Sequence, residues 1–432
     1  MDGFEEALRA EVDAAPVIDV HTHLRPGKPE ADDLADIVLY HHLWIELVSA
    51  GMPADAATRA GLPHEVADPG MTPRERLQAA LPYLDRIRNT TCASFLRVML
   101  KDLYGVPGGE LRAENLEEVM AKAAERASDP GWRFEVLQNR CRIARSLTVE
   151  GRGQPAWSQT IGKGIEVGGF SLVSGKQSSA EMVDSIEREL GVELSKPEAY
   201  GGAMLARGRD YSQRPIHFVG VWLRPEVIWL EPRESEVAAV VARARAGHRL
   251  DQEEQSVFTC YGLRNLLKGL GAGPMRTVQV IVGAEVLPPH RSVTNWAPEL
   301  PGTLARMAGE FEDLHFNCST AAEAHGQDLA VLAKHIPNVS VGGYWWHTLY
   351  PSYIRRSIET RLDMVPANKI VAFFSDAYHA EWCYPKLKLV KRILAEAVLE
   401  RVKEGIYTQE VALSLARQVL YENPKRIYGV GG

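Results

Sequence analysis

The chain has 432 residues and a formal net charge of −7, from 49 basic and 56 acidic side chains. This mild, dispersed charge argues against a nucleic-acid surface, and no apolar run approaches the ~20 residues needed to cross a bilayer. The acidic N-terminus lacks the features of a signal peptide, and the five cysteines have no C-x-x-C spacing. We therefore expect a cytoplasmic protein with free thiols that contacts neither membrane nor nucleic acid.

The first strand is predicted at residues 17–20, an apolar run that follows Pro16 and leads directly into His21-Thr22-His23. Because side chains on a strand alternate between its two faces, we expect both imidazoles to point toward the same side. Imidazole is a common ligand for zinc and similar ions, so His21 and His23 are predicted metal ligands. The alternative is a pair of loop histidines that only make hydrogen bonds.

Residues 30–130 are predicted to form a helical subdomain inserted after this strand. The acidic pair at 32–33 can cap a helix that runs to Gly51, and Thr72 can cap another with Pro73 at its first position. About a hundred helical residues before the next strand indicate an insertion that contributes to the mouth of the active site.

Strands and helices alternate after residue 130, which favours an α/β fold. The predicted strands are Cys141–Val149, Ile216–Leu223, Val278–Gly283, Asp313–Cys318, Val339–Trp346 and Ile370–Ser375. Their continuous apolar character is typical of a parallel sheet covered on both faces. We predict a (β/α)₈ barrel from residues 1–29 and 131–432. An open doubly wound sheet is the alternative, although no G-x-G-x-x-G follows a strand.

Two later regions complete the expected organisation. Residues 150–215 begin with a Gly- and Ser-rich stretch, expected to be a long active-site loop or a poorly ordered excursion, and contain one helix from Ser179 to Gly191. Near the C-terminus, Pro385 is expected to open a helix that closes at Gly405. Thr408 caps the next helix, which is expected to end at the Asn-Pro pair at 423–424.

Asp376 follows the last predicted strand. In a closed barrel the end of the last strand lies beside the first strand, so this carboxylate is expected next to His21 and His23. There it could bind the metal ion, act as a general base, or do both. The alternative is a capping role for the following helix, which the expected helix start near Pro385 disfavours.

The segments VIDVHTHL at 17–24, SDAYH at 375–379 and YENPKRIYG at 421–429 resemble the uronate (glucuronate) isomerases of the amidohydrolase superfamily. Residues 40–51 also follow the family's pattern D-H-Y-K-W-R-x-M-R-x-x-G, with His42 in place of its tyrosine. Arg224, in Leu-Arg-Pro, resembles a family arginine that contacts substrate. The segment 341–346 resembles its G-x-x-W-W segment. The similarity is good over about 17–51 and 338–429, and thin between.

Two positions depart from the family pattern. The family's last strand usually reads T-D-S-R, with an arginine that holds the sugar acid, whereas this chain has Ser375-Asp376-Ala377-Tyr378. The family often has a histidine in Q-L-H-x-G-A, where this chain has Ile281, an apolar side chain that cannot bind a metal. A three-ligand site of His21, His23 and Asp376 remains.

Several further residues are candidates for substrate binding. Arg224 could hold a carboxylate, or could form a salt bridge at a strand end. His41 is the preferred catalytic candidate of the adjacent pair, because a helix separates neighbouring side chains by about 100°. His42, Trp346 and Tyr378 are expected to line the substrate pocket, Trp346 by stacking on a sugar ring.

The resemblance implies a metal-assisted isomerase that interconverts the aldose and ketose forms of a hexuronate or related sugar acid. One divalent ion, zinc or manganese, would be the cofactor, and Asp376 or His41 would move the proton. The first alternative is a hydrolase or decarboxylase of a small carboxylated substrate. The second is a non-catalytic sugar-acid binder. The expected partner is a small-molecule sugar acid or other carboxylated substrate. The sequence leaves open whether the chain forms a homo-oligomer.

Overall fold

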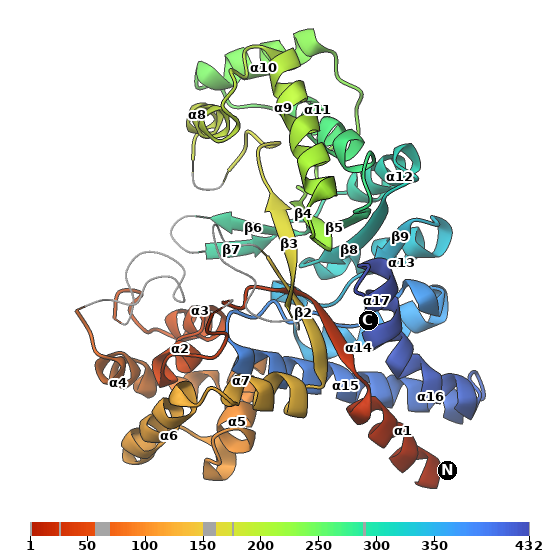
Figure 1. Ribbon diagram of the computed structural model, residues 1–432. Coiled ribbons are helices and arrows are strands. Elements are labelled where there is room, and N and C mark those ends of the chain that lie inside the picture. Colours follow the sequence, from red (N-terminus) through yellow and green to blue (C-terminus); the bar gives the residue numbers. More distant parts are fainter. Residues whose placement is uncertain are drawn as a thin grey trace.

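The computed structural model describes residues 2–25, 27–56, 70–149, 161–174, 177–287 and 291–431. Its centre is a seven-stranded sheet whose neighbouring strands pair in parallel, in the order β1-β2-β3-β4-β5-β8-β9 (Figure 1). The strands are β1 (Val17–Thr22), β2 (Ile143–Val149), β3 (Ile161–Val167), β4 (Phe218–Trp222), β5 (Thr277–Val282), β8 (His315–Thr320) and β9 (Val339–Val341). The α/β class and the predicted β1, β2, β4, β5 and β8 are confirmed.

The segment 370–377 bonds to both outer strands of this sheet. The amide of Val371 donates to the carbonyl of Val341 at 2.9 Å, and the amide of Asp376 donates to the carbonyl of His21 at 3.0 Å. Only an isolated bridge between Val341 and Ile370 belongs to the sheet here, so the predicted strand Ile370–Ser375 is wrong as a regular element. The segment nonetheless brings the end of the chain against its first strand.

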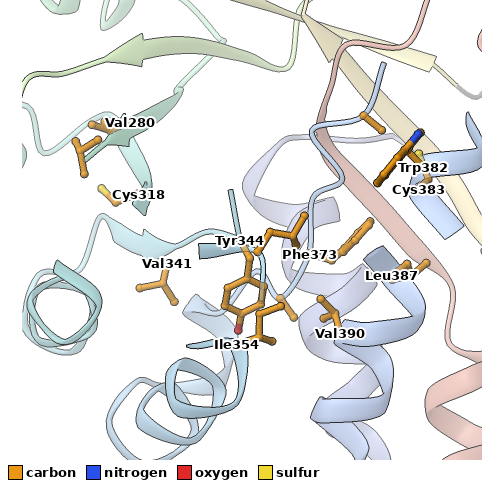
Figure 2. Close-up of a cluster of buried hydrophobic side chains, with 14 of the residues drawn as sticks. Val280, Cys318, Val341, Tyr344, Ile354, Phe373, Trp382, Cys383, Leu387 and Val390 are labelled. Atoms are coloured by element: carbon orange, nitrogen blue, oxygen red, sulfur yellow. The ribbon is translucent and has the colours of Figure 1, made fainter. Parts of the chain in front are cut away.

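The outer face of the sheet is apolar and packs on helices. Val280, Cys318 and Val341 come from three neighbouring strands and belong to the same buried cluster as Ile354 and Leu387. Figure 2 shows this cluster, which reaches α14 (Pro351–Met364) and α15 (Ala380–Lys403). Because residues alternate along each strand, the side chains between these apolar positions face the opposite side of the sheet.

That inner face is partly polar, which the sequence did not lead us to expect. Gln279, Asn317 and Ser340 are completely buried, and each lies next to an outward-facing apolar residue. A second buried cluster accompanies them and includes Ile18, Phe218, Ile281, Phe374 and Tyr428.

All the regular elements that the structure describes between β1 and β2 are helices. Its α-helices include α2 (Leu34–Val38), α3 (His41–Ser49), α4 (Pro73–Leu84), α5 (Thr91–Asp102) and α6 (Leu116–Ser128), which form one group in Figure 1. Thr72 caps α4 and forms a capping box with Glu75, as its sequence predicts. Asp33 caps α2, but the helix expected to reach Gly51 is interrupted between Leu39 and Tyr40.

A second helical group was not predicted. It contains α8 (Ser179–Leu190), α9 (Pro197–Gln213), α10 (Glu234–Arg245) and α11 (Gln252–Leu270), and projects from the sheet on the side away from α2–α6 (Figure 1). The predicted helix from Ser179 is confirmed as α8, and Gly191 ends it in a left-handed conformation. The expected loop or excursion after residue 150 is wrong over 161–167, which is β3. Residues 150–160 lie outside the described part.

The C-terminal helices begin and end differently from the predictions. Helix α15 starts at Ala380, so Pro385 lies inside its first turns rather than opening it. Thr408 caps α16 (Gln409–Arg417) as predicted. The Asn-Pro pair at 423–424 begins α17 (Asn423–Ile427) instead of ending a helix, because proline is tolerated in a first helical turn. None of the described helices is long and apolar enough to span a membrane.

The remaining elements connect these groups. They include α1 (Asp2–Ala14), α7 (Trp132–Phe134), α12 (Leu300–Glu310), α13 (Gly326–His335) and the hairpin of β6 (Ala284–Leu287) and β7 (Arg291–Thr294). The predicted strand Val339–Trp346 is too long, because β9 ends at Val341. Trp346 instead begins a short 3₁₀ turn with φ of 43°. The five cysteines carry free thiols, as expected.

Candidate metal centre

The three predicted metal ligands converge. The Nε2 atoms of His21 and His23 lie 3.3 Å apart, and Oδ1 of Asp376 lies 3.6 Å and 3.2 Å from them, respectively. One ligand atom from each residue falls within 4.8 Å of the others. His21 is the penultimate residue of the buried strand β1, His23 directly follows this strand, and the segment 370–377 supplies Asp376. The structure therefore brings together residues from opposite ends of the sequence.

Asp376 has an unusual backbone conformation that its surroundings hold in place. Its φ of 50° lies in the left-handed region, which aspartate adopts more readily than most non-glycine residues. Its amide donates to the carbonyl of His21 at 3.0 Å, and its carbonyl accepts from the Tyr40 hydroxyl at 3.2 Å. Both backbone groups are thus satisfied while the carboxylate turns toward the histidines.

The residue before Asp376 is held on both sides. Oδ1 of Asp19 accepts from the amide of Ser375 at 2.8 Å, and Nζ of Lys386 donates to the Ser375 carbonyl at 2.7 Å. Asp19 and Lys386 are completely buried, so these bonds form away from solvent. The sequence does not mark Lys386 as part of this site, because a lysine in a helix normally lies at the surface.

The charges of the cluster suit metal ligation. Burial opposes ionisation of Asp376, but the hydrogen bond and charge of His23 outweigh it and lower the pKa of Asp376 to about 2. Burial and the neighbouring His23 lower the pKa of His21, which favours its neutral form. The pKa of His23 is raised, because Asp376 outweighs the cost of burial. A divalent ion can replace the proton held between His23 and Asp376, since metal ligands must be deprotonated.

His21 turns its Nε2 toward His23 and Asp376 and its Nδ1 toward Gln279. Its Nδ1 lies 2.5 Å from Oε1 of Gln279, and the rings of Phe218 and Phe374 lie 6.1 Å and 5.5 Å from the imidazole. Two imidazole nitrogens and one carboxylate form a donor set that zinc accepts, with space left for a substrate atom or water. The residues present therefore fit one divalent ion.

Glu166 is a functional candidate that the sequence analysis missed. It lies on β3, and its Oε1 is 3.9 Å from Nε2 of His21. The side chain is 44% exposed, in contrast to the buried Asp376. Gly220 on the next strand leaves room for it, because a Cβ there would lie 3.1 Å from Cγ of Glu166. The glycine-rich surroundings of β3 concealed the strand and with it this carboxylate.

Aromatic and imidazole rings adjoin the metal centre. The ring of Tyr378 stacks on His23 at 4.5 Å with an interplanar angle of 10°. His41 lies 5.4 Å from Tyr378, which places the preferred member of the histidine pair one ring away from the metal ligands. His42 lies 4.0 Å from His41, and both are buried. His41 and Tyr378 thus lie near the predicted metal ligands, and His42 lies next to His41.

Arg224 is engaged in ion pairs. Its Nε lies 2.5 Å from Glu226, and its two terminal nitrogens lie 3.2 Å and 3.4 Å from the carboxylate oxygens of Glu285. These three residues line a polar cavity that also involves the second helical group. The other residues of its lining are Val173, Ser179, Arg249, Leu250, Asp251, Gln252 and Gln255. The three metal-site residues are not part of the lining. The structure therefore places Arg224 in a salt bridge, which was the alternative role.

The tryptophan pair after β9 divides as expected. Trp345 is buried, whereas Trp346 is partly exposed. Trp222, at the end of β4, is 41% exposed and packs edge-on against both, with ring centroids 5.0 Å and 6.2 Å away. Trp346 therefore remains available for stacking, and Trp222 is an aromatic neighbour that sequence reasoning missed.

Three of the remaining histidines have local partners. His315 lies 2.8 Å from the Ser340 hydroxyl, His325 contacts Asp328, and His347 lies 3.0 Å from Ser292. His290 lies outside the described residues.

The comparisons with known proteins agree on one fold. No family model matches the chain. Its sequence is 19% identical to a uronate isomerase from Thermotoga sp. (strain RQ2), over 97% of this chain and 95% of that protein. It superimposes on the uronate isomerase from Thermotoga maritima with a TM-score of 0.83 and 15% identity, over 99% and 97% of the two chains. For the glucuronate isomerase from Caulobacter crescentus the values are 0.81 and 18%, over 100% and 94%. The chain therefore has the fold of the uronate isomerases over its whole length, as its terminal motifs predict.

Proposed function

We propose that this chain is a metal-dependent isomerase that interconverts the aldose and ketose forms of a hexuronate or related sugar acid, as a divergent member of the amidohydrolase superfamily. The observation that carries the proposal is the convergence of His21, His23 and Asp376 in a chain that aligns end to end with uronate isomerases. A single divalent ion, zinc or manganese, is the proposed cofactor.

The proposed architecture is a (β/α)₈ barrel that the segment 370–377 completes as its eighth member. Its hydrogen bonds to Val341 on one side and His21 on the other support this closure. In such a barrel the active site lies at the carboxyl ends of the strands, where His21, Glu166 and Asp376 are found. The proposed insertion of residues 30–130 supplies His41 to the same mouth.

The ion would supply Lewis acidity, which lowers the proton affinity of a substrate oxygen. The protein groups would then move one proton between two carbons. A carboxylate at the mouth removes the proton from C2 while O1 gains a proton, which gives an enediol. Return of the carbon-bound proton to C1 and loss of the O2 proton complete the ketose. Glu166 suits this exchange because it is accessible and within 3.9 Å of His21.

The proposed substrate contacts surround that mouth. Tyr378 and His41 would contact the sugar hydroxyls, with His42 supporting His41, and Trp346 would stack on the sugar. Arg224 would hold the substrate carboxylate, which must then displace Glu226 or Glu285 from its donors. Asp376 remains a second candidate for the proton-carrying group.

The test is metal analysis of the purified chain, followed by assays on glucuronate and galacturonate before and after chelation. We expect about one ion per chain, with conversion to the ketose that chelation abolishes and metal restores. Asp376→Asn should lose both metal and activity, whereas Asp328→Asn, at a carboxylate on α13, should retain both. A metal-loaded chain that converts no uronate would reject the isomerase. A chain that takes up no metal would reject the site.

A hydrolase or decarboxylase of a small carboxylated substrate is the second candidate. Tyr378 occupies the position of the family's sugar-acid arginine and stacks on His23, and Arg224 is already paired. The site therefore offers fewer cationic side chains to bind the carboxylate of a sugar acid than the family pattern does. Hydrolysis of a uronolactone or amide by the metal-loaded chain, without isomerisation, would favour this candidate.

A further inference from the structure

A series of hydrogen-bonded, buried polar side chains leads inward from His21 of the metal centre. This file, as we call it, consists of Gln279, Tyr428, Asn317 and Ser340. Gln279 lies between His21 and Tyr428, with Oε1 2.5 Å from Nδ1 of His21 and Nε2 2.8 Å from the Tyr428 hydroxyl. Its Nε2 also lies 3.3 Å from the carbonyl of Val20. Gln279 has no exposed surface, and Tyr428 is 2% exposed. This file belongs to none of the substrate contacts proposed above.

The hydrogen-bond chemistry fixes the orientation of Gln279. A backbone carbonyl can only accept, so the group that faces Val20 must be the NH₂ of the amide. The amide oxygen therefore faces His21 and can only accept, which requires Nδ1 of His21 to carry the hydrogen. A neutral imidazole with its hydrogen on Nδ1 presents a lone pair at Nε2. That atom is the one 3.6 Å from Asp376.

The same direction of donation continues beyond Gln279. The Tyr428 hydroxyl accepts from Gln279 and donates to Oδ1 of Asn317 at 2.9 Å. Nδ2 of Asn317 then donates to the Ser340 hydroxyl at 2.8 Å. If the side-chain amide of Gln279 were rotated by half a turn, its oxygen would face the carbonyl oxygen of Val20, so that two acceptors would meet. Nδ1 of His21 would then lose its acceptor. Each bond therefore reinforces the orientation of the next.

Tyr428 reaches this file from the C-terminal segment. Its backbone carbonyl lies 2.9 Å from Nδ1 of His217, and the preceding Ile427 accepts a hydrogen bond from Thr277, the first residue of β5. The ring packs edge-on against Phe218 at 5.8 Å. The C-terminal segment thus seats a hydroxyl inside the sheet at a fixed position.

We propose that Gln279 and Tyr428 are positioning residues of the metal centre, which hold His21 in the tautomer and ring orientation that metal binding requires. The inference rests on the proposed metal site but not on the isomerase reaction. Groups that bond to the outer nitrogen of a metal-binding histidine commonly change metal affinity by about 10–100-fold. Because Tyr428 in turn orients Gln279, a residue near the C-terminus also affects the metal affinity.

The experiment compares the full-length wild type with Gln279→Leu and Tyr428→Phe. Tyr200→Phe is the matched control, because Tyr200 is also buried and loses one hydrogen bond, to the carbonyl of Gly169, in another part of the fold. Zinc affinity is measured by competition with a chromogenic chelator. The tautomer of His21 in the metal-free chain is read from the ¹⁵N shifts of its ring by NMR, assigned with the His21→Gln variant.

We expect zinc affinity to fall by about 10–100-fold in Gln279→Leu, by less in Tyr428→Phe, and to stay unchanged in Tyr200→Phe. His21 should be protonated at Nδ1 in the wild type and a mixture of tautomers in both network variants. Tyr428→Phe decides the question if Gln279→Leu does not fold. The inference would be overturned if Tyr428→Phe, together with Gln279→Leu where it folds, kept the wild-type zinc affinity and a single Nδ1–H tautomer of His21. A wild type that binds no zinc would reject the metal site, while the tautomers would still test the order of the hydrogen bonds.

Discussion

Lys386 donates a hydrogen bond from Nζ to the carbonyl oxygen of Ser375 at 2.7 Å, inside the protein core. The lysine has no exposed surface, and burial lowers its pKa while the nearby charge of Asp376 opposes that change. A buried lysine is costly unless it has partners, so its position behind Asp376 calls for a role. It holds the peptide that precedes the metal-site carboxylate.

The first prediction concerns this lysine. Lys386→Met keeps most of the side-chain volume but removes the donor to Ser375 and the positive charge beside Asp376. We expect zinc affinity to fall by about 10-fold and the unfolding free energy to fall by roughly 1–3 kcal/mol, because a buried carbonyl loses its partner. Chelator competition and urea unfolding measure the two effects. Lys388→Met, at an exposed lysine paired with Asp102, should change neither by much. Equal effects of the two substitutions would contradict the assigned role.

The second prediction concerns Glu166. Glu166→Gln preserves shape but removes the group that could exchange a proton with substrate carbon. We expect kcat to fall by about 10²–10⁴-fold while the zinc content stays at the wild-type level, since the three ligands remain. Steady-state kinetics and metal analysis on the same preparation separate these effects. Glu198→Gln, at an exposed carboxylate on α9, is the control. An unchanged kcat would exclude Glu166 and leave Asp376 or His41 as the proton carrier.

The metal-site residues could be predicted from the sequence because each of them follows an apolar run that indicates a strand. His21 and His23 follow an apolar run, and Asp376 follows another, so a parallel sheet that closes into a barrel predicts that they meet. The helix caps at Thr72 and Thr408 were equally predictable, because their side chains bond to neighbouring amides.

The features that could not be predicted from the sequence depend on the register of the strands and on tertiary packing, which overrides local propensity. Gln279 bonds to His21 only because β5 places it on the inner face, and a lone glutamine in an apolar strand carries no such signal. Lys386 lies on the apolar side of α15, where a surface position is the usual expectation. The predicted strand Ile370–Ser375 forms only an isolated bridge at Ile370, and the apolar run does not signal the left-handed backbone of Asp376 that follows it, with φ of 50°. Glu166 lies in a glycine-rich stretch with low strand propensity.

The third prediction uses the competition for Arg224. If this guanidinium holds the substrate carboxylate, Glu285 is an internal competitor for the same donors. We expect Arg224→Met to raise the KM for glucuronate by about 10-fold, equivalent to about 1.4 kcal/mol. Glu285→Gln should lower KM instead, because it releases two donors. Opposite changes in KM are the required result. Loss of thermal stability in both variants with KM unchanged would assign Arg224 a structural salt bridge only.

The last prediction concerns acid stability and His315. Burial, with Arg426 and Lys369 nearby, lowers the pKa of His315 from 6.5 to about 4. Between these values the unfolded chain binds more protons at this position than the folded chain does. The unfolding free energy should therefore fall as the pH is lowered from 6.5 to 4, by at most about 3 kcal/mol from this group. Above pH 6.5 the contribution is complete and constant.

His315→Gln should flatten this dependence, because glutamine does not titrate and its amide can still form a hydrogen bond with the Ser340 hydroxyl. Urea unfolding midpoints at pH 7.0, 5.5 and 4.5 provide the measurement. His335→Gln, at an exposed histidine on α13, should follow the wild type at every pH. A His315→Gln variant that loses as much stability as the wild type between pH 7.0 and 4.5 would show that the acid sensitivity arises elsewhere. A flattened profile would assign the loss of stability in this pH range to His315, whose Nε2 lies 2.8 Å from the Ser340 hydroxyl.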